Sequence, residues 1–126
     1  MKTKASFGII IGILLFLSSL AHAFLGWPNL YVELTSTHVS DKIIGALAIG
    51  WYFGSVAMAT FGIIVLLAGH KMLKGNPFSS APIYIISFAY FLFGFVAFIA
   101  RDFNPHFLFF IVMGILVGLF AKFIQH

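Results

Sequence analysis

The chain has 126 residues, enough for one domain, and 62% of them are hydrophobic while only 8% are charged. A typical soluble chain is about a quarter charged, so this composition and the mean hydropathy of +1.11 exclude a water-soluble globular domain. The absence of cysteine excludes disulfides and thiolate metal sites, and the net charge of +4 comes from dispersed side chains that suit anionic lipid rather than nucleic acid.

The first apolar run predicts a helix over residues 5–25, and its fate has two interpretations. A basic start, an apolar run and the Ala-His-Ala sequence at 21–23 fit a secretory signal peptide with its cleavage site. Two features favour retention as a membrane helix. The apolar run continues past residue 23, and Gly8 with Gly12 forms a helix-packing motif. Retention keeps four helices in the protein, whereas cleavage would leave three.

Three further apolar runs predict helices over residues 43–69, 81–100 and 107–124. Each is close to the ~20 residues that cross a bilayer as a helix. A single apolar run can satisfy its backbone hydrogen bonds in hydrocarbon only as a helix. Pro82 and Pro105 stand where the third and fourth helices should begin. The sequence therefore predicts an all-α fold, a four-helix membrane bundle that forms one domain over residues 1–126.

The charged residues are sorted between the gaps that separate these helices. The carboxylates Glu33, Asp41 and Asp102 all lie in the gaps at 26–42 and 101–105. The positive-inside rule then predicts that both termini lie in the cytoplasm, next to an anionic inner leaflet. A bacterial cytoplasmic membrane is the expected location. The other gaps and the chain ends carry most of the cations: Lys2, Lys4, Lys71, Lys74 and Lys122.

Small residues four apart predict close contacts between helices, because helices in lipid associate through packing rather than through escape from water. The pattern favours a compact bundle, a homo-oligomer or a place in a larger membrane complex. Whether each groove faces a sister helix or another subunit stays open. The pattern occurs as Gly8 and Gly12 in the first helix, Ala46, Gly50 and Gly54 in the second, and Gly114 and Gly118 in the fourth.

His22 stands alone among apolar residues near the predicted end of the first helix. Ionisable residues inside a membrane are candidates for function. His22 could also have a purely structural role. It could form a hydrogen bond to Ser55, Tyr90 or a main-chain carbonyl, or contact interfacial water. A bis-His haem would need a second ligand opposite His22, and His106 is the residue at a suitable depth.

A transition-metal site at the outer face is a further hypothesis, because imidazole together with carboxylate suits Zn, Cu or Fe. Asp102 and His106 are four residues apart, and His38 and Asp41 are three apart, so each pair could present two ligands together. Such pairs are common by chance, and the break at Asn104-Pro105 disturbs the helical geometry of the first pair. The candidate metal ligands are His22, His38, Asp41, Asp102 and His106.

A small-ligand pocket is also predicted in the outer half of the bundle, with apolar walls and a few polar groups. Aromatic residues at helical spacing serve packing more often than ligand binding, and Arg101 could simply pair with Asp102. The candidate ligand residues are His22, Trp51, Tyr52, Ser55, Tyr90 and Arg101.

No motif in the sequence names a reaction. The apolar runs hold no carboxylate for proton coupling, and the sequence has no P-loop, HExxH motif or Ser–His–Asp order. We therefore expect a non-enzymatic membrane protein without a cofactor, which binds a partner or a lipid-like small molecule in the outer half of the bundle. The alternatives are a redox protein that binds a metal or haem at the outer face, and a small passive transporter or pore.

Overall fold

The computed structural model describes residues 2–125, and helices dominate this part of the chain. Four helical segments are long and apolar enough to cross a membrane: Lys2–Ser36, Asp41–Leu73, Ala81–Ala100 and Pro105–Gln125. The chain is therefore a multi-pass membrane protein. The elements are α1 (Lys2–Ala21), the π-helical turn η1 (His22–Gly26), α2 (Trp27–Ser36), α3 (Asp41–Leu73), α4 (Ala81–Ala100), the 3-10 turn η2 (Pro105–Phe107) and α5 (Leu108–Gln125).

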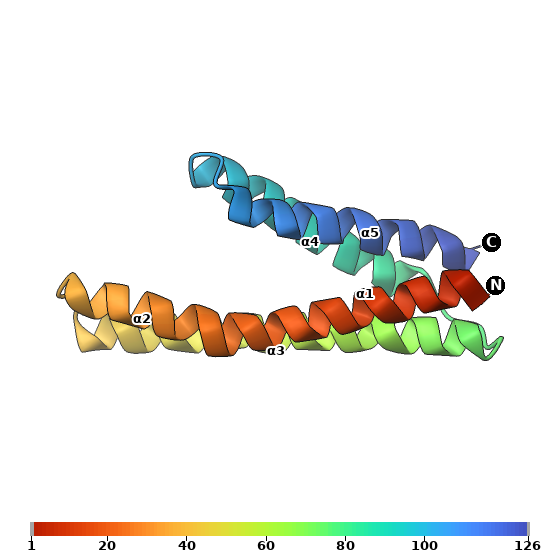
Figure 1. Ribbon diagram of the computed structural model, residues 1–126, viewed down its shortest axis with the longest axis horizontal. Helices are drawn as coiled ribbons and strands as arrows, with labels where there is room; N and C mark the ends of the chain where they lie inside the picture. The colour runs from red at the N-terminus through yellow and green to blue at the C-terminus, as the bar shows by residue number, and fades with distance from the viewer. Residues whose placement is uncertain (1, 126) are drawn as a thin grey trace.

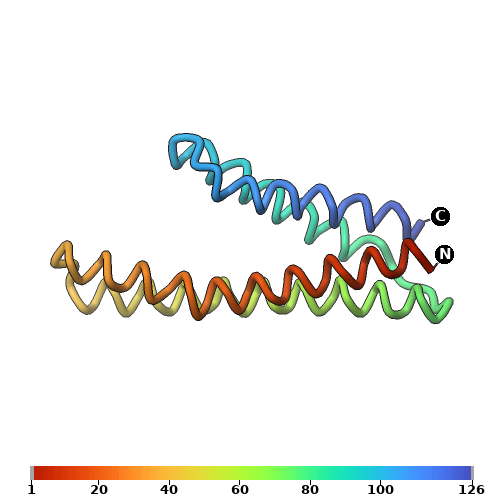
Figure 2. Tube along the Cα trace, viewed as in Figure 1, coloured from red at the N-terminus to blue at the C-terminus, as the bar shows by residue number. Residues whose placement is uncertain are grey.

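The helices form two antiparallel hairpins (Figure 1). In the first hairpin α1, η1 and α2 run on from one another alongside α3, and in the second α4 lies against α5. Figure 2 shows both chain ends and the α3–α4 connection at one end of the molecule, here called the terminal end. The α2–α3 and α4–α5 turns lie toward the other end, the turn end. The hairpins meet near the terminal end and diverge toward the turn end.

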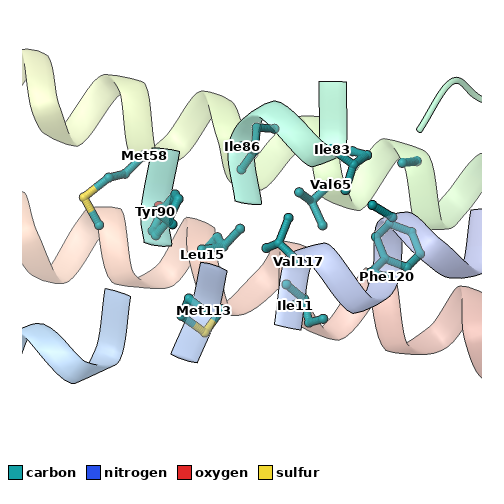
Figure 3. Packing of buried hydrophobic residues seen from close by; sticks show 12 residues of the cluster. Ile11, Leu15, Met58, Val65, Ile83, Ile86, Tyr90, Met113, Val117 and Phe120 are labelled. Carbon is teal, nitrogen blue, oxygen red and sulfur yellow. The ribbon is translucent and has the colours of Figure 1, made fainter. Parts of the chain in front are cut away.

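The hydrophobic core lies where the two hairpins meet (Figure 3). Leu15 of α1, Val65 of α3, Ile83 of α4 and Val117 of α5 are fully buried there. Figure 3 shows these side chains gathered between the helices, so the core draws on both hairpins. Many large apolar side chains elsewhere are exposed, among them Phe53 at 74%. Acyl chains are the natural neighbours of such a surface.

Glycines allow close backbone contact within each hairpin. A Cβ atom on Gly62 of α3 would lie 2.7 Å from the main-chain nitrogen of Phe16 on α1. One on Gly114 of α5 would lie 2.6 Å from the main-chain nitrogen of Phe91 on α4. Neither position has room for a side chain. The spacing of four residues does not identify Gly62, because the next glycine of α3 that meets α1, Gly69, lies two turns away rather than one.

The predicted packing glycines occupy different kinds of site. A Cβ atom on Gly50 would have no neighbour within 4 Å, and Ala46 is exposed, so this part of the expected α3 groove joins no two helices of the chain. A Cβ on Gly54 would make only an ordinary contact, 3.8 Å from His22 Cε1. The others face a neighbouring helix: Gly8 faces Phe120, Gly12 faces Leu66, Gly114 faces Phe91 and Gly118 faces Ser87.

The first helical segment is longer than the sequence predicts. The sequence predicts a loop over residues 26–42, whereas the helix continues to Ser36 and only residues 37–40 connect it to α3. Pro28 has no N–H and its ring crowds the preceding turn, which normally ends a helix. The π-helical turn immediately before Pro28 widens the spiral at this point. The helix can therefore pass through the proline.

Candidate functional site

A cleft of about 280 Å³ lies between the two hairpins, both of which contribute to its lining. It adjoins the core, because Met58 and Tyr90 belong to both. His22 and Tyr90 are the lining residues that carry a polar side-chain group, and no lining residue is a lysine, arginine, aspartate or glutamate. The first hairpin contributes His22, Gly54, Met58 and Phe61, and the second contributes Ala89, Tyr90, Phe93 and Phe110.

Aromatic rings form much of the cleft wall. The Tyr90 ring lies 6.0 Å from that of Phe110, with 27° between their planes. Phe61 meets Tyr90 edge-on at 6.2 Å, and Phe93 meets Phe110 edge-on at 4.9 Å. Offset and edge-to-face pairs of this kind add to the packing energy. The aromatic rings of the cleft wall therefore hold one another in place.

His22 is held by two residues of α3. Its Nδ1 atom lies 2.8 Å from Ser55 Oγ, and its ring stacks on the Trp51 indole at 4.2 Å with 9° between the planes. The Trp51 Nε1–H group in turn donates a hydrogen bond of 2.7 Å to the main-chain carbonyl of His22. Ser55 is among the partners that the sequence suggested for His22. These contacts fix both the position and the plane of the imidazole.

The hydrogen-bond network uses one of the two imidazole nitrogens. Nδ1 of His22 pairs with Ser55 Oγ, which also lies 3.2 Å from the main-chain carbonyl of Trp51. The tautomer of the imidazole decides which of the two groups donates. Nε2 is left for a ligand, as a donor in one tautomer and as an acceptor in the other.

The local sequence explains why the π-helical turn brings His22 to Trp51. A π-helical turn breaks the regular ladder of α-helical hydrogen bonds, and the carbonyl of His22 within this turn accepts the indole N–H of Trp51. Gly26 ends the same turn, and a Cβ there would lie 2.7 Å from the Trp51 ring. The glycine therefore leaves the space that the indole needs.

Tyr90 is the second polar group of the cleft. Its side chain is 4% exposed, and its hydroxyl is the sole buried side-chain polar atom without a hydrogen-bond partner within residues 2–125. Buried hydroxyl groups in proteins are generally paired, because an unpaired one loses its bonds to water without replacement. The Tyr90 hydroxyl is therefore a hydrogen-bond donor without an acceptor among the described residues.

The structure brings some of the predicted ligand residues together and leaves others apart. His22 and Tyr90 line the cleft, while Trp51 and Ser55 lie behind His22 and hold it. Tyr52 is 44% exposed and its ring lies 6.0 Å from that of Trp27. Tyr52 is not part of the cleft lining. Arg101 is exposed in the α4–α5 turn and does not line the cleft either.

The candidate metal ligands do not converge. Over residues 2–125, no three histidine, aspartate or glutamate side chains lie close enough to hold one metal ion. His38 lies in the α2–α3 turn, while Asp102 and His106 belong to the α4–α5 turn and its flank. Figure 1 shows these two turns well separated, because the hairpins diverge. The predicted ligands lie near the same end of the molecule, but this alone does not bring them close enough to coordinate one metal ion.

The apolar lining residues are those that the sequence did not single out. Met58, Phe61, Phe93 and Phe110 lie within uniformly apolar helices. Nothing in the local sequence separates them from phenylalanines that face lipid, such as Phe53 and Phe88. The splay of one hairpin from the other creates the cleft, and that is a property of the tertiary structure.

No protein-family model, curated protein or solved structure matches this chain. The geometry of the cleft is therefore the guide to its function.

Proposed function

We propose that this chain is a small polytopic membrane protein that binds a neutral, lipid-like small molecule in the cleft between its two hairpins. The observation that carries the proposal is an apolar, aromatic-walled cleft with a buried, unpaired hydroxyl on Tyr90. Apolar walls with a small number of polar groups are typical of small-molecule sites. A membrane-soluble compound can reach such a site from the bilayer without crossing water.

The charge of the lining favours a neutral ligand. No lining residue is a lysine, arginine, aspartate or glutamate that would pair with an ionised group of a ligand. Burying an unpaired charge in an apolar environment is costly. A phospholipid head group or an ionised fatty acid therefore suits the cleft poorly.

The proposal includes a topology, in which the hairpins form a four-helix bundle in a bacterial cytoplasmic membrane with both chain ends inside. Lys71 and Lys74 lie at the terminal end together with both chain ends, and Asp41 and Asp102 lie in or beside the turns at the other end (Figure 1). The positive-inside rule supports this orientation. The cleft would then lie in the outer half of the membrane.

Photo-labelling tests whether the cleft is a binding site. The full chain in lipid nanodiscs is exposed to an alkane that carries a diazirine, irradiated, and mapped by peptide mass spectrometry. We expect saturable labelling of the peptides that contain Met58, Phe61, Phe93 or Phe110.

Two glycine variants make a matched pair for this experiment. Gly54→Leu places a side chain in the cleft, while Gly50→Leu adds the same side chain one turn away, where a Cβ meets nothing within 4 Å. We expect the first to abolish saturable labelling and the second to preserve it. Labelling that never saturates, or that is equal in both variants, would overturn the proposal.

A further inference from the structure

We infer that the ligand of the cleft is a flat, neutral ring compound that carries carbonyl oxygens, the chemistry of a quinone head group. The inference rests on the proposed function and narrows it to one class of molecule. It follows from the hydrogen-bonding capacity of the cleft, its charge and the shape of its walls.

The Tyr90 hydroxyl requires an acceptor on the ligand. It is buried, belongs to a residue that lines the cleft, and has no partner within the described chain. An acyl chain or any other hydrocarbon would leave it unpaired, which costs free energy. A ring carbonyl satisfies it, because a phenolic O–H is a good donor to such an oxygen.

The walls favour a flat ring over a flexible chain. Phe61, Tyr90, Phe93 and Phe110 line the cleft and contact one another through the faces and edges of their rings. Aromatic rings gain additional energy from offset and edge-to-face contacts with one another. A planar conjugated ring uses these surfaces, whereas an acyl chain uses only their hydrophobicity.

His22 supplies a second polar contact on the opposite hairpin. Its bond to Ser55 uses Nδ1, so Nε2 is left for the ligand, and Trp51 fixes the plane of the ring. A quinone carries two oxygens on opposite edges of its ring, so one can accept from Tyr90 while the other accepts from Nε2–H. Its reduced form carries a hydroxyl at each of these positions, and one of them can donate to Nε2 in the other tautomer of His22.

The size of the cleft suits a head group rather than a whole isoprenoid lipid. The volume of about 280 Å³ is close to the small end of the ~300–1,000 Å³ that is usual for small-molecule sites. A single substituted ring fills such a space. A long tail would leave between the diverging hairpins and lie in the bilayer (Figure 1).

Competition against the diazirine alkane tests this inference in the full chain in nanodiscs. The competitors are decylubiquinone and decylbenzene, which share a ten-carbon tail on a flat six-membered ring. Decylubiquinone also carries two carbonyl oxygens, two methoxy groups and a methyl group. We expect decylubiquinone to protect the cleft peptides at lower concentration than decylbenzene. Tyr90→Phe keeps the ring and removes the hydroxyl, and should raise the half-protecting concentration of decylubiquinone about five- to tenfold.

Tyr84→Phe is the matched control, because Tyr84 lies on the same helix, is 39% exposed and does not line the cleft. Protection by decylubiquinone should be unchanged in this variant, and protection by decylbenzene should be equal in all three proteins. Equal protection by both competitors, or no effect of Tyr90→Phe, would overturn the quinone inference while saturable alkane labelling still supported the binding site. Absence of saturable labelling would overturn both.

Discussion

The hydroxyl of Tyr90 is expected to affect both the stability of this protein and its affinity for a ligand. It lies in a side chain that is 4% exposed, and no hydrogen-bond partner reaches it within residues 2–125. Such an atom lowers the stability of the empty protein and raises the affinity for a molecule that satisfies it. Stability and binding are therefore expected to respond in opposite directions to its removal.

We expect Tyr90→Phe to raise the free energy of unfolding of the ligand-free protein by about 1 kcal/mol, because the desolvated, unpaired hydroxyl disappears while the ring remains. Unfolding in increasing sodium dodecyl sulfate measures the change. Tyr84→Phe provides the comparison, since the Tyr84 side chain is 39% exposed, and its effect should stay within ~0.5 kcal/mol. A clear loss of stability in Tyr90→Phe would mean that the hydroxyl has a partner in the native protein.

The His22–Ser55 pair should show a measurable energetic coupling. A double-mutant cycle with His22→Leu and Ser55→Ala isolates the 2.8 Å hydrogen bond between the two helices. Hydrogen bonds between membrane helices couple by about 0.6 kcal/mol on average and up to about 1.7 kcal/mol.

The same cycle with Thr60→Ala in place of Ser55→Ala is the control. Thr60 lies on the same helix as Ser55 but is exposed and donates to the carbonyl of Val56 within that helix, so its coupling to His22 should be close to zero. Equal coupling in the two cycles would argue against a specific His22–Ser55 bond.

At the level of elements, the sequence predicts the four apolar helices but not their full lengths. The run at 81–100 coincides with α4, whereas the segment that begins in α1 continues to Ser36, eleven residues beyond the predicted end at 25. Gly26, Trp27 and Pro28 favour a helix end by local rules. The π-helical turn and its contacts with Trp51 overcome that local preference. Local rules do not include a partner helix.

Contact between α1 and α3 depends on glycine at position 62. We expect Gly62→Ala to lower the free energy of unfolding by about 1–3 kcal/mol, because its Cβ would lie 2.7 Å from the main chain of Phe16 and the helices would have to separate. Gly50→Ala introduces the same change on the same helix in open space and should be neutral or stabilising, by up to ~1 kcal/mol. Titration with sodium dodecyl sulfate compares the two, and equal effects would contradict this account.

The candidate site is predictable from the sequence only through its polar residues. An isolated histidine in an apolar helix stands out, and Ser55 and Tyr90 are natural partners for it by type. The aromatic wall does not stand out, because 17 phenylalanines are spread along the chain and most positions are equally apolar. The convergence of His22 with Tyr90 depends on how the hairpins cross, which local periodicity does not determine.

For the whole molecule, both hairpins turn at the same end, and the proposed topology puts that end outside the cell (Figure 1). The chain has no cysteine, so single-cysteine variants can be labelled without background. We expect a membrane-impermeant maleimide to label Thr37→Cys and Phe103→Cys in intact cells. Asn76→Cys, in the α3–α4 connection, should react only after the membrane is permeabilised. Labelling of Asn76→Cys in intact cells would reverse the topology.

The two hairpins differ in length, and under the proposed function this difference would give the membrane a role in access to the cleft. At ~1.5 Å per residue, the 35 residues of Lys2–Ser36 reach about 50 Å, whereas the 20 residues of α4 reach about 30 Å, close to one hydrocarbon thickness. The shorter hairpin is therefore only just long enough to cross the hydrocarbon core. In a thicker bilayer the α4–α5 turn would lie below the head groups, and the entrance of the cleft would face hydrocarbon. In a thinner bilayer the entrance would lie in the hydrated interface. Lipid composition would therefore affect how readily an apolar ligand enters the cleft.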